Sequence, residues 1–203
     1  MAGAGIIGLG HYAPQRIVTN KELEQRLQMP AEVILERCGI HQRHIAAPEE
    51  ATSDLALQAA RKALADAGVE ASELNLIIVA TSTSDRLSPG SAVSVQAGLG
   101  ATKAAAFDLL AACSGFVYGL VMGCQLIKSG LYKKVLVIGA ETVSKFVDCQ
   151  DANTSILFGD GAGAAVLGEV PDGYGLLGSD LGTDGTEAEV LQIPAGGSRL
   201  PAS

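Results

Sequence analysis

The sequence predicts a layered α/β fold, because strand-like and helix-like segments alternate and because the composition favours close packing. Short, strand-like runs cover residues 76–81, 107–110, 135–140 and 162–168, and the run at 76–81 is continuously apolar, which is typical of a strand buried on both faces. Hydrophobic residues make up 48% of the 203 residues, and 25 residues are glycine, so backbone layers can approach closely. The segments between these runs have helical features, and strands that alternate with helices indicate a sheet covered by helices.

The N-terminal region predicts a strand followed by a helix. Residues 6–17 read as the strand and its turn. Asn20 is a candidate N-cap of the helix that follows, since Leu23 and Leu27 are apolar at helical spacing. Residues 41–45 alternate only weakly between apolar and polar side chains.

Three helices are expected in the middle of the chain. Thr52 or Ser53 can cap a helix over residues 54–67, which Gly68 ends. A loop then leads into a helix of small residues at 92–99. The third covers 117–127 and has almost no charged face, so we expect it to be buried.

The character of the chain changes near its end. Residues 173–203 are rich in glycine and proline and hold only short apolar fragments. We therefore expect residues 1–172 to form one α/β unit, and residues 173–203 to begin a connecting loop.

Composition argues against several classes of function. A net charge of −8 disfavours binding to nucleic acid or to an anionic membrane. No uncharged apolar run approaches the roughly 20 residues that span a bilayer, and no basic segment followed by an apolar stretch marks a secretion signal. The four cysteines lack C-x-x-C spacing, so we expect no metal site, and reduced thiols fit a cytoplasmic protein.

Cys113 is the strongest candidate for a reactive residue. It lies between the strand-like run that ends at Leu110 and the helix-like run that begins at Val117. A helix N-terminus stabilises negative charge by up to ~2 kcal/mol, which favours the nucleophilic thiolate of a cysteine. Its position alone leaves open a second interpretation, in which Cys113 is a small, buried packing residue.

The segment Cys113-Ser114-Gly115 resembles the active-cysteine corner of the thiolase superfamily, and the β-ketoacyl-acyl-carrier-protein synthase III family in particular. Similar motifs occur along nearly the whole chain, in the same order. They are Gly-Leu-Gly-His-Tyr-Ala-Pro at 8–14, Arg-Cys-Gly-Ile at 37–40, Thr-Ser-Asp-Leu-Ala at 52–56, Ile-Val-Ala-Thr at 78–81 and Phe-Gly-Asp-Gly-Ala-Gly-Ala at 158–164.

This resemblance implies a thiolase-like layered fold. Proteins of this type consist of two similar halves, each a mixed central sheet flanked by helices. The chain resembles the first half and shows no internal repeat, so we expect the second half to be absent from it and to belong to a second chain or to a longer protein. The resemblance also implies a homodimer.

The implied activity is that of an acyl-thioester condensing enzyme in fatty acid or polyketide biosynthesis. Cys113 would accept an acyl primer, which a decarboxylative Claisen condensation with a malonyl thioester would extend. Acyl-CoA or acyl-carrier-protein thioesters would be substrates, acyl carrier protein a partner, and no cofactor would be tightly bound. The family's catalytic histidine and asparagine belong to the second half, and we expect His11, His41 and His44 to be surface or packing residues.

Two alternatives to this activity stay open. One is an acyltransferase of the same superfamily that performs no condensation, and the other is a non-catalytic partner subunit. Cys113 argues against the second alternative, because a subunit without an acylation step needs no thiol at this corner.

Several positions depart from the family's pattern for substrate binding. Arg37 could contact a phosphate of coenzyme A, but the tryptophan and arginine that stack on its adenine are replaced by Val33 and Ala152. Near Leu87, a loop position where the family can place a phenylalanine in the partner's primer pocket holds Ser88. We expect weak coenzyme A binding and a larger primer pocket, although local divergence of the loop also explains Ser88.

Three other patterns suggest less specific functions. The spacing Gly3-x-Gly5-x-x-Gly8 fits a dinucleotide fingerprint, but no strand precedes it. The glycines around Asp160 lack the lysine of a phosphate-binding loop, and we expect them to let the backbone pass close to the active-site helix. Three lysines over 128–134 form either a solvated helix end or a docking site for an acidic carrier protein.

Overall fold

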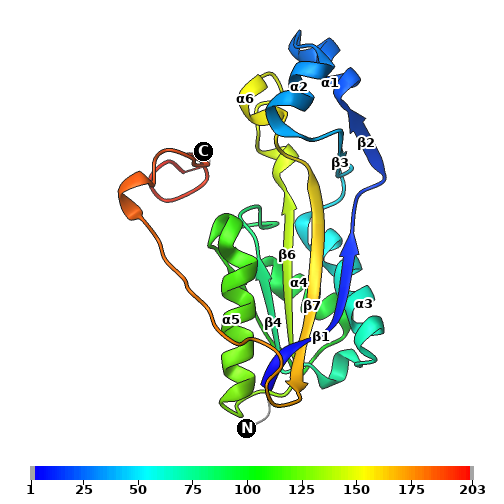
Figure 1. Cartoon of the computed structure of the whole chain (residues 1–203), viewed down its shortest axis with the longest axis vertical. Helices are drawn as coiled ribbons and strands as arrows, with labels where there is room; N and C mark the ends of the chain where they lie inside the picture. Colours follow the sequence, from blue (N-terminus) through cyan, green and yellow to red (C-terminus); the bar gives the residue numbers. More distant parts are fainter. Residues whose placement is uncertain (1–2, 202–203) are drawn as a thin grey trace.

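A five-stranded mixed sheet forms the centre of the protein in the computed structural model, which describes residues 3–201 (Figure 1). The strand order is β1-β7-β6-β4-β5. Strands β4, β5 and β6 are parallel, whereas β7 runs antiparallel to its neighbours β6 and β1. The strands are β1 (Gly3–Tyr12), β4 (Leu76–Ala80), β5 (Ala105–Leu109), β6 (Val135–Thr142) and β7 (Asp160–Val170).

The central strand β4 explains why the apolar run at 76–81 is continuous. All five of its residues are buried, because helices cover both faces of the sheet. Ile77 and Val79 pack into one core cluster, and Leu76 and Ile78 pack into the other. The predicted mixed sheet flanked by helices is therefore confirmed.

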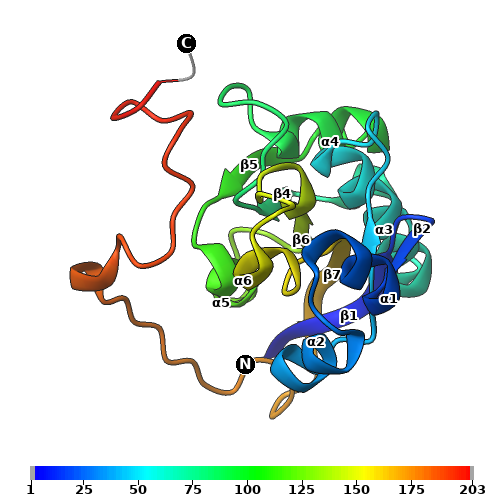
Figure 2. The same cartoon turned by 90° about the horizontal axis from the view of Figure 1, so that it is seen from above.

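Three long helices form the outer layers. Helices α3 (Thr52–Ala67) and α4 (Ser91–Leu99) lie on one face of the sheet, and α5 (Gly115–Lys128) lies on the other (Figure 2). The glycines of β1 allow α3 to lie very close, since a Cβ on Gly8 would be 2.5 Å from Ala67 and one on Gly10 would be 2.3 Å from the carbonyl oxygen of Ala59. Gly8 therefore serves strand–helix packing, whereas a Cβ on Gly3 or Gly5 would meet the segment after β7, at Tyr174 and Gly175.

A smaller unit lies beyond the end of the sheet at which β6 ends (Figure 1). Its antiparallel pair is β2 (Arg16–Thr19) with β3 (Gln42–Ile45), and its helices are α1 (Asn20–Leu27), α2 (Ala31–Cys38) and α6 (Ala152–Ser155). These elements share a third cluster of buried residues, made up of Val18, Leu23, Ile34 and Ile156. Short 3₁₀ turns complete the fold, at Ala71–Glu73, Ala112–Ser114, Val143–Lys145 and Gly185–Glu187.

The expected strand and turn over residues 6–17 agree only in part with the structure. β1 ends at Tyr12, but Arg16 and Ile17 begin a second strand, β2, which pairs with β3 in a different sheet. The expectation that the helix after Cys113 is buried was wrong. Helix α5 is apolar all round but is not fully buried, since Val117 and Met122 on its outer side are 50% and 38% exposed.

After β7, the chain is extended and mostly exposed up to residue 201. It pairs briefly with β1, where Leu176 N donates to the Ala4 carbonyl oxygen, and then follows α5. Lys128 Nζ donates to the Leu176 carbonyl oxygen, and the Tyr118 hydroxyl donates to the Gly182 carbonyl oxygen. The proposed boundary at residue 172 stays a prediction, although the long helices and strands of the described part all precede it.

Candidate active site

Cys113 lies on a sharp corner between β5 and α5. The chain leaves β5 at Leu109, forms the 3₁₀ turn Ala112–Ser114 and enters α5 at Gly115. Ala112 has a φ of 45°, a left-handed conformation that typically costs ~1–3 kcal/mol in a residue other than glycine. The Cys113 thiol is free and exposed, so the interpretation of Cys113 as a buried packing residue was wrong.

A stripe of glycines seats α5 directly on the sheet. Gly115, Gly119 and Gly123 lie four residues apart and are all buried on one side of the helix. A Cβ at Gly119 would lie 2.7 Å from Val137 Cγ1, and one at Gly123 would lie 2.6 Å from Leu167 Cδ1. The helix that follows Cys113 is therefore held at a short, fixed distance from β6 and β7.

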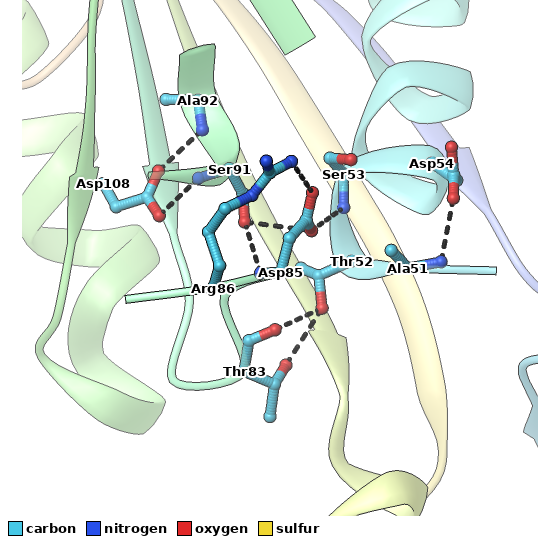
Figure 3. A network of polar contacts seen from close by, with 10 residues as sticks. All are labelled: Ala51, Thr52, Ser53, Asp54, Thr83, Asp85, Arg86, Ser91, Ala92 and Asp108. Carbon is cyan, nitrogen blue, oxygen red and sulfur yellow. Dashed lines mark hydrogen bonds and ion pairs between the residues drawn. The ribbon is translucent and has the colours of Figure 1, made fainter. Parts of the chain in front are cut away.

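The start of α5 differs from those of α3 and α4, because both of the latter are capped by aspartates (Figure 3). Asp85 accepts a hydrogen bond from Ser53 N in α3 at 2.9 Å, and Asp108 accepts from Ser91 N and Ala92 N in α4 at 2.7 Å each. Helix α5 has no side-chain cap. Ser114 N and Gly115 N donate to the carbonyl oxygens of Ala111 and Ala112. No described acidic side chain caps this end of α5, so its dipole can stabilise negative charge beside Cys113.

A buried polar cluster lies beside this corner, where β4 and β6 end. Glu141 accepts hydrogen bonds from Ser82 N at 2.8 Å and from the Thr83 hydroxyl at 2.5 Å. Thr142 N in turn donates to Thr83 Oγ1, and the Thr52 hydroxyl contacts both threonines. Sequence reasoning missed this cluster, although a carboxylate at the end of a buried parallel strand was a usable signal.

The other predicted site residues lie on separate segments. Arg37 is in the last turn of α2 and is exposed, while Leu87 and Ser88 are on the exposed tip of the loop between β4 and α4. Val33 is on α2, and Ala152 is the first residue of α6. The loop, both helices and the start of α5 all belong to the same end of the molecule (Figure 1), but no described contact joins these residues to Cys113.

Buried Arg43 connects the helices of this end. Its guanidinium donates to Asn20 Oδ1 at 2.8 Å and to the Ile156 carbonyl oxygen at 2.9 Å, which links the start of α1 to the end of α6. Burial is the main cause that lowers the pKa of Arg43 from its ordinary value.

The three histidines take no part in this site. His11 and His41 are exposed, and His44 Nδ1 lies 2.5 Å from the Pro14 carbonyl oxygen. Their interpretation as surface or packing residues agrees with these positions.

The secondary motifs lie away from Cys113. The three lysines cluster at the far end of α5, about 20 Å along the helix from the corner. Asp160, the first residue of β7, accepts hydrogen bonds from Ala46 N and Ser144 N. Its neighbour Gly159 faces Arg43 and His44, so the expectation that these glycines pass close to the active-site helix was wrong.

Residues 3–201 contain no group of three or more acidic, histidine or cysteine side chains placed to bind a metal ion. Within the same range, no helix is both long enough and apolar enough to span a membrane.

The fold and the cysteine corner define a thiolase-like protein. The family model described as 3-oxoacyl-[acyl-carrier-protein] synthase III matches residues 107–185. A curated relative from Caldanaerobacter subterraneus, named β-ketoacyl-[acyl-carrier-protein] synthase III, is 54% identical over 200 residues, which cover 98% of this chain and 60% of the relative. The chain is thus similar to β-ketoacyl-acyl-carrier-protein synthase III along nearly its whole length.

Solved structures show the same similarity. The Thermus thermophilus β-ketoacyl-acyl-carrier-protein synthase III superposes with a TM-score of 0.88 at 46% identity, over 91% of this chain and 57% of that one. The priming β-ketosynthase of the R1128 polyketide pathway superposes with a TM-score of 0.83 at 37% identity, over 91% of this chain and 55% of that one.

The chain spans about 60% of the length of the curated relatives that it matches. The matches run along 98% and 100% of the chain in the first two of these relatives. These alignments give no support to the expectation of a second polypeptide that carries a missing half.

Proposed function

We propose that Cys113 is the acyl-accepting nucleophile of a condensing enzyme that extends an acyl primer with a malonyl thioester. The observation that carries this proposal is the exposed thiol at the uncapped start of α5. The similarity to β-ketoacyl-acyl-carrier-protein synthase III supports the same role for Cys113.

In the first step, the Cys113 thiolate attacks the carbonyl carbon of an acyl thioester. The bond from carbon to the donor's sulfur breaks, and the departing thiolate takes a proton. Negative charge on the carbonyl oxygen is stabilised by nearby N–H groups, for which the backbone N–H of Cys113 is the candidate. An oxyanion donor of this kind typically contributes ~3 kcal/mol to the transition state.

In the second step, a malonyl thioester loses carbon dioxide, and the resulting carbanion attacks the acyl-Cys113 carbonyl. The carbon–sulfur bond to Cys113 breaks, which releases a β-ketoacyl thioester and restores the thiolate. The product serves fatty acid biosynthesis, and the similarity to a polyketide priming synthase favours polyketide priming as a second use.

The donor is an acyl thioester of coenzyme A or of acyl carrier protein. Arg37 on α2 offers a positive charge for a phosphate of either donor. Val33 and Ala152 supply no group that stacks on adenine, which favours a carrier protein or another thioester. Ser88, in place of an aromatic side chain, favours longer or branched primers. We also propose that the protein forms a homodimer and acts in the cytoplasm.

The test is intact-mass spectrometry of the chain after incubation with a mixed set of acyl thioesters. We expect one acyl adduct, which peptide mapping places on Cys113, and its mass identifies the preferred primer. A chain that gains no adduct from any thioester, or gains one only on another cysteine, would overturn the proposal.

A further inference from the structure

We propose that Ala112 is a positioning residue for Cys113, because its left-handed backbone conformation confines the turn that carries the thiol. This role deepens the proposed function and rests on it. The observation behind it is the type of residue that stands where the backbone of the corner has a positive φ.

Elsewhere in the described part of the chain, positive φ angles occur almost only at glycine. Seven described glycines have a positive φ, and the two other described residues that do are Gln28 and Ala112. Three of the glycines end helices α2, α3 and α4. Glycine adopts this conformation without strain, whereas a residue with a Cβ does not. Beside Cys113 the chain therefore has alanine at a position where glycine would relieve strain.

The methyl group of Ala112 has no packing role that would explain its presence. Ala112 is exposed, and no residue of the turn Ala112–Ser114 is buried. The Cβ therefore acts on the backbone of the turn itself. It limits φ and ψ of Ala112 to the small left-handed region, whereas a glycine would have a much broader range.

The two ends of the corner are held against the same residue, Ala80 at the end of β4. Leu109, the last residue of β5, is the register partner of Ala80, and its carbonyl oxygen accepts from Thr81 N at 3.2 Å. A Cβ on Gly115, the first residue of α5, would lie 3.1 Å from Ala80 Cβ. Residues 110–114 must therefore connect two fixed points, and such constraints keep a strained conformation in place.

Hydrogen bonds around Cys113 couple its position to that of Ala112. Ser114 N donates to the Ala111 carbonyl oxygen at 3.1 Å, and Gly115 N donates to the Ala112 carbonyl oxygen. Cys113 lies within both of these turns, so a rotation about the backbone of Ala112 moves the thiol relative to α5. Attack on a thioester needs the reacting atoms about 3–3.5 Å apart, and a misplacement of about 1 Å can reduce the rate about 100-fold.

The experiment measures acylation of Cys113 by acetyl-CoA in the full chain, at several donor concentrations. In A112G we expect the maximal rate to fall about threefold to tenfold and the half-saturating concentration to stay the same, because the change affects the placement of the thiol. Alkylation of Cys113 by iodoacetamide needs no bound geometry and should change by less than about twofold. The thermal midpoint of A112G should rise by about 2–4 °C, because the strain is removed.

Two further variants are controls. A112S keeps a Cβ and places its hydroxyl at an exposed position, so it should retain the wild-type rate and midpoint. Q28G is the matched control for relief of strain, since Gln28 has a φ of 52°, is exposed and lies at the end of α1. It should raise the midpoint by a similar amount and leave acylation of Cys113 unchanged.

The combination of a more stable A112G protein, slower acylation and unchanged alkylation supports this role. Acylation of A112G at the wild-type rate, equal reductions in acylation and alkylation, or a lower thermal midpoint would overturn it. The proposed function is tested separately by the wild type. A wild-type chain that forms no acyl adduct would overturn the proposed function and with it the role of Ala112, whereas equal acylation of the wild type and A112G would overturn only the role of Ala112.

Discussion

Asp108, on the strand that leads to Cys113, accepts a hydrogen bond from the backbone N–H of Ser91 at 2.7 Å. This contact joins β5 to the first turn of α4, and Ala92 N donates to the same carboxylate. The strand and the helix are thereby held together at the edge of the sheet that carries the candidate site (Figure 3).

Replacement of Asp108 by alanine should lower the free energy of unfolding by about 1–2 kcal/mol, the usual cost of a lost helix cap. Urea denaturation followed by circular dichroism measures the change. D108N, which keeps one acceptor oxygen, should lose less. Equal losses in the two variants would mean that packing, and not the cap, explains the effect.

Replacement of Gly119 by alanine should destabilise the protein by about 1–3 kcal/mol, because the new methyl group would be 2.7 Å from Val137 Cγ1. Gly163 is the control, since a Cβ there meets no atom within 4 Å. Thermal denaturation should show a clear decrease in the midpoint for G119A and a much smaller change for G163A. A midpoint for G119A as high as that of the wild type would argue against tight seating of α5.

Cys113 should react faster with iodoacetamide than Cys149, although both thiols are exposed. Cys113 lies at the start of α5, whose dipole favours negative charge, whereas Cys149 lies between Asp148 and Gln150. Peptide mapping after short exposure to the reagent gives the two rates. In C113A the rapid reaction should disappear, and in C149A it should persist; comparable rates at the two cysteines would contradict a role for the helix terminus.

The stability of the protein should depend on Cys124 at alkaline pH. Burial raises the pKa of this thiol above its ordinary value of 9.0, so the folded state keeps a proton that the unfolded state loses. The stabilising contribution is complete below pH 9 and decreases as pH rises from there through the folded-state pKa. The difference in free energy of unfolding between the wild type and C124A should therefore be constant up to about pH 8 and shrink above pH 9.

That comparison cancels the titration of other groups, because both proteins contain them. A difference that stays constant between pH 7 and pH 10 would show that the Cys124 thiol ionises alike in the two states.

Restoring the two stacking groups should tighten the binding of coenzyme A. We expect V33W combined with A152R to gain about 1–3 kcal/mol, as aromatic stacking on a base typically provides. Isothermal titration with coenzyme A measures the affinity, and titration with pantetheine, which lacks adenine, is the control. Equal gains with both ligands would mean that the new side chains act outside the adenine site.

Much of the fold could be predicted from the sequence because its signals are local. The apolar run at residues 76–81 contains β4, and the glycine at position 68 ends α3 as expected. The division of residues 6–17 between two sheets could not be predicted, since β1 pairs with a strand about 160 residues later. Such pairing depends on register and on distant partners, which apolar spacing alone does not encode.

The candidate site, too, could be predicted only where its signal is local in the sequence. The cysteine corner was recognisable from the junction of a strand and a helix. The link between Glu141 and Thr83 was not, because their hydrogen bond joins the ends of two strands that are 58 residues apart in the sequence.

Because Gly115, Gly119 and Gly123 have no side chains, α5 lies close to the sheet, and this short distance sets the position of Cys113. In a saturation library of this chain, Gly119 and Gly123 should tolerate almost no replacement, much like Cys113 itself, although they face the sheet and not the solvent. Intolerance to substitution would then identify the positions that hold the helix against the sheet as well as the reacting residue.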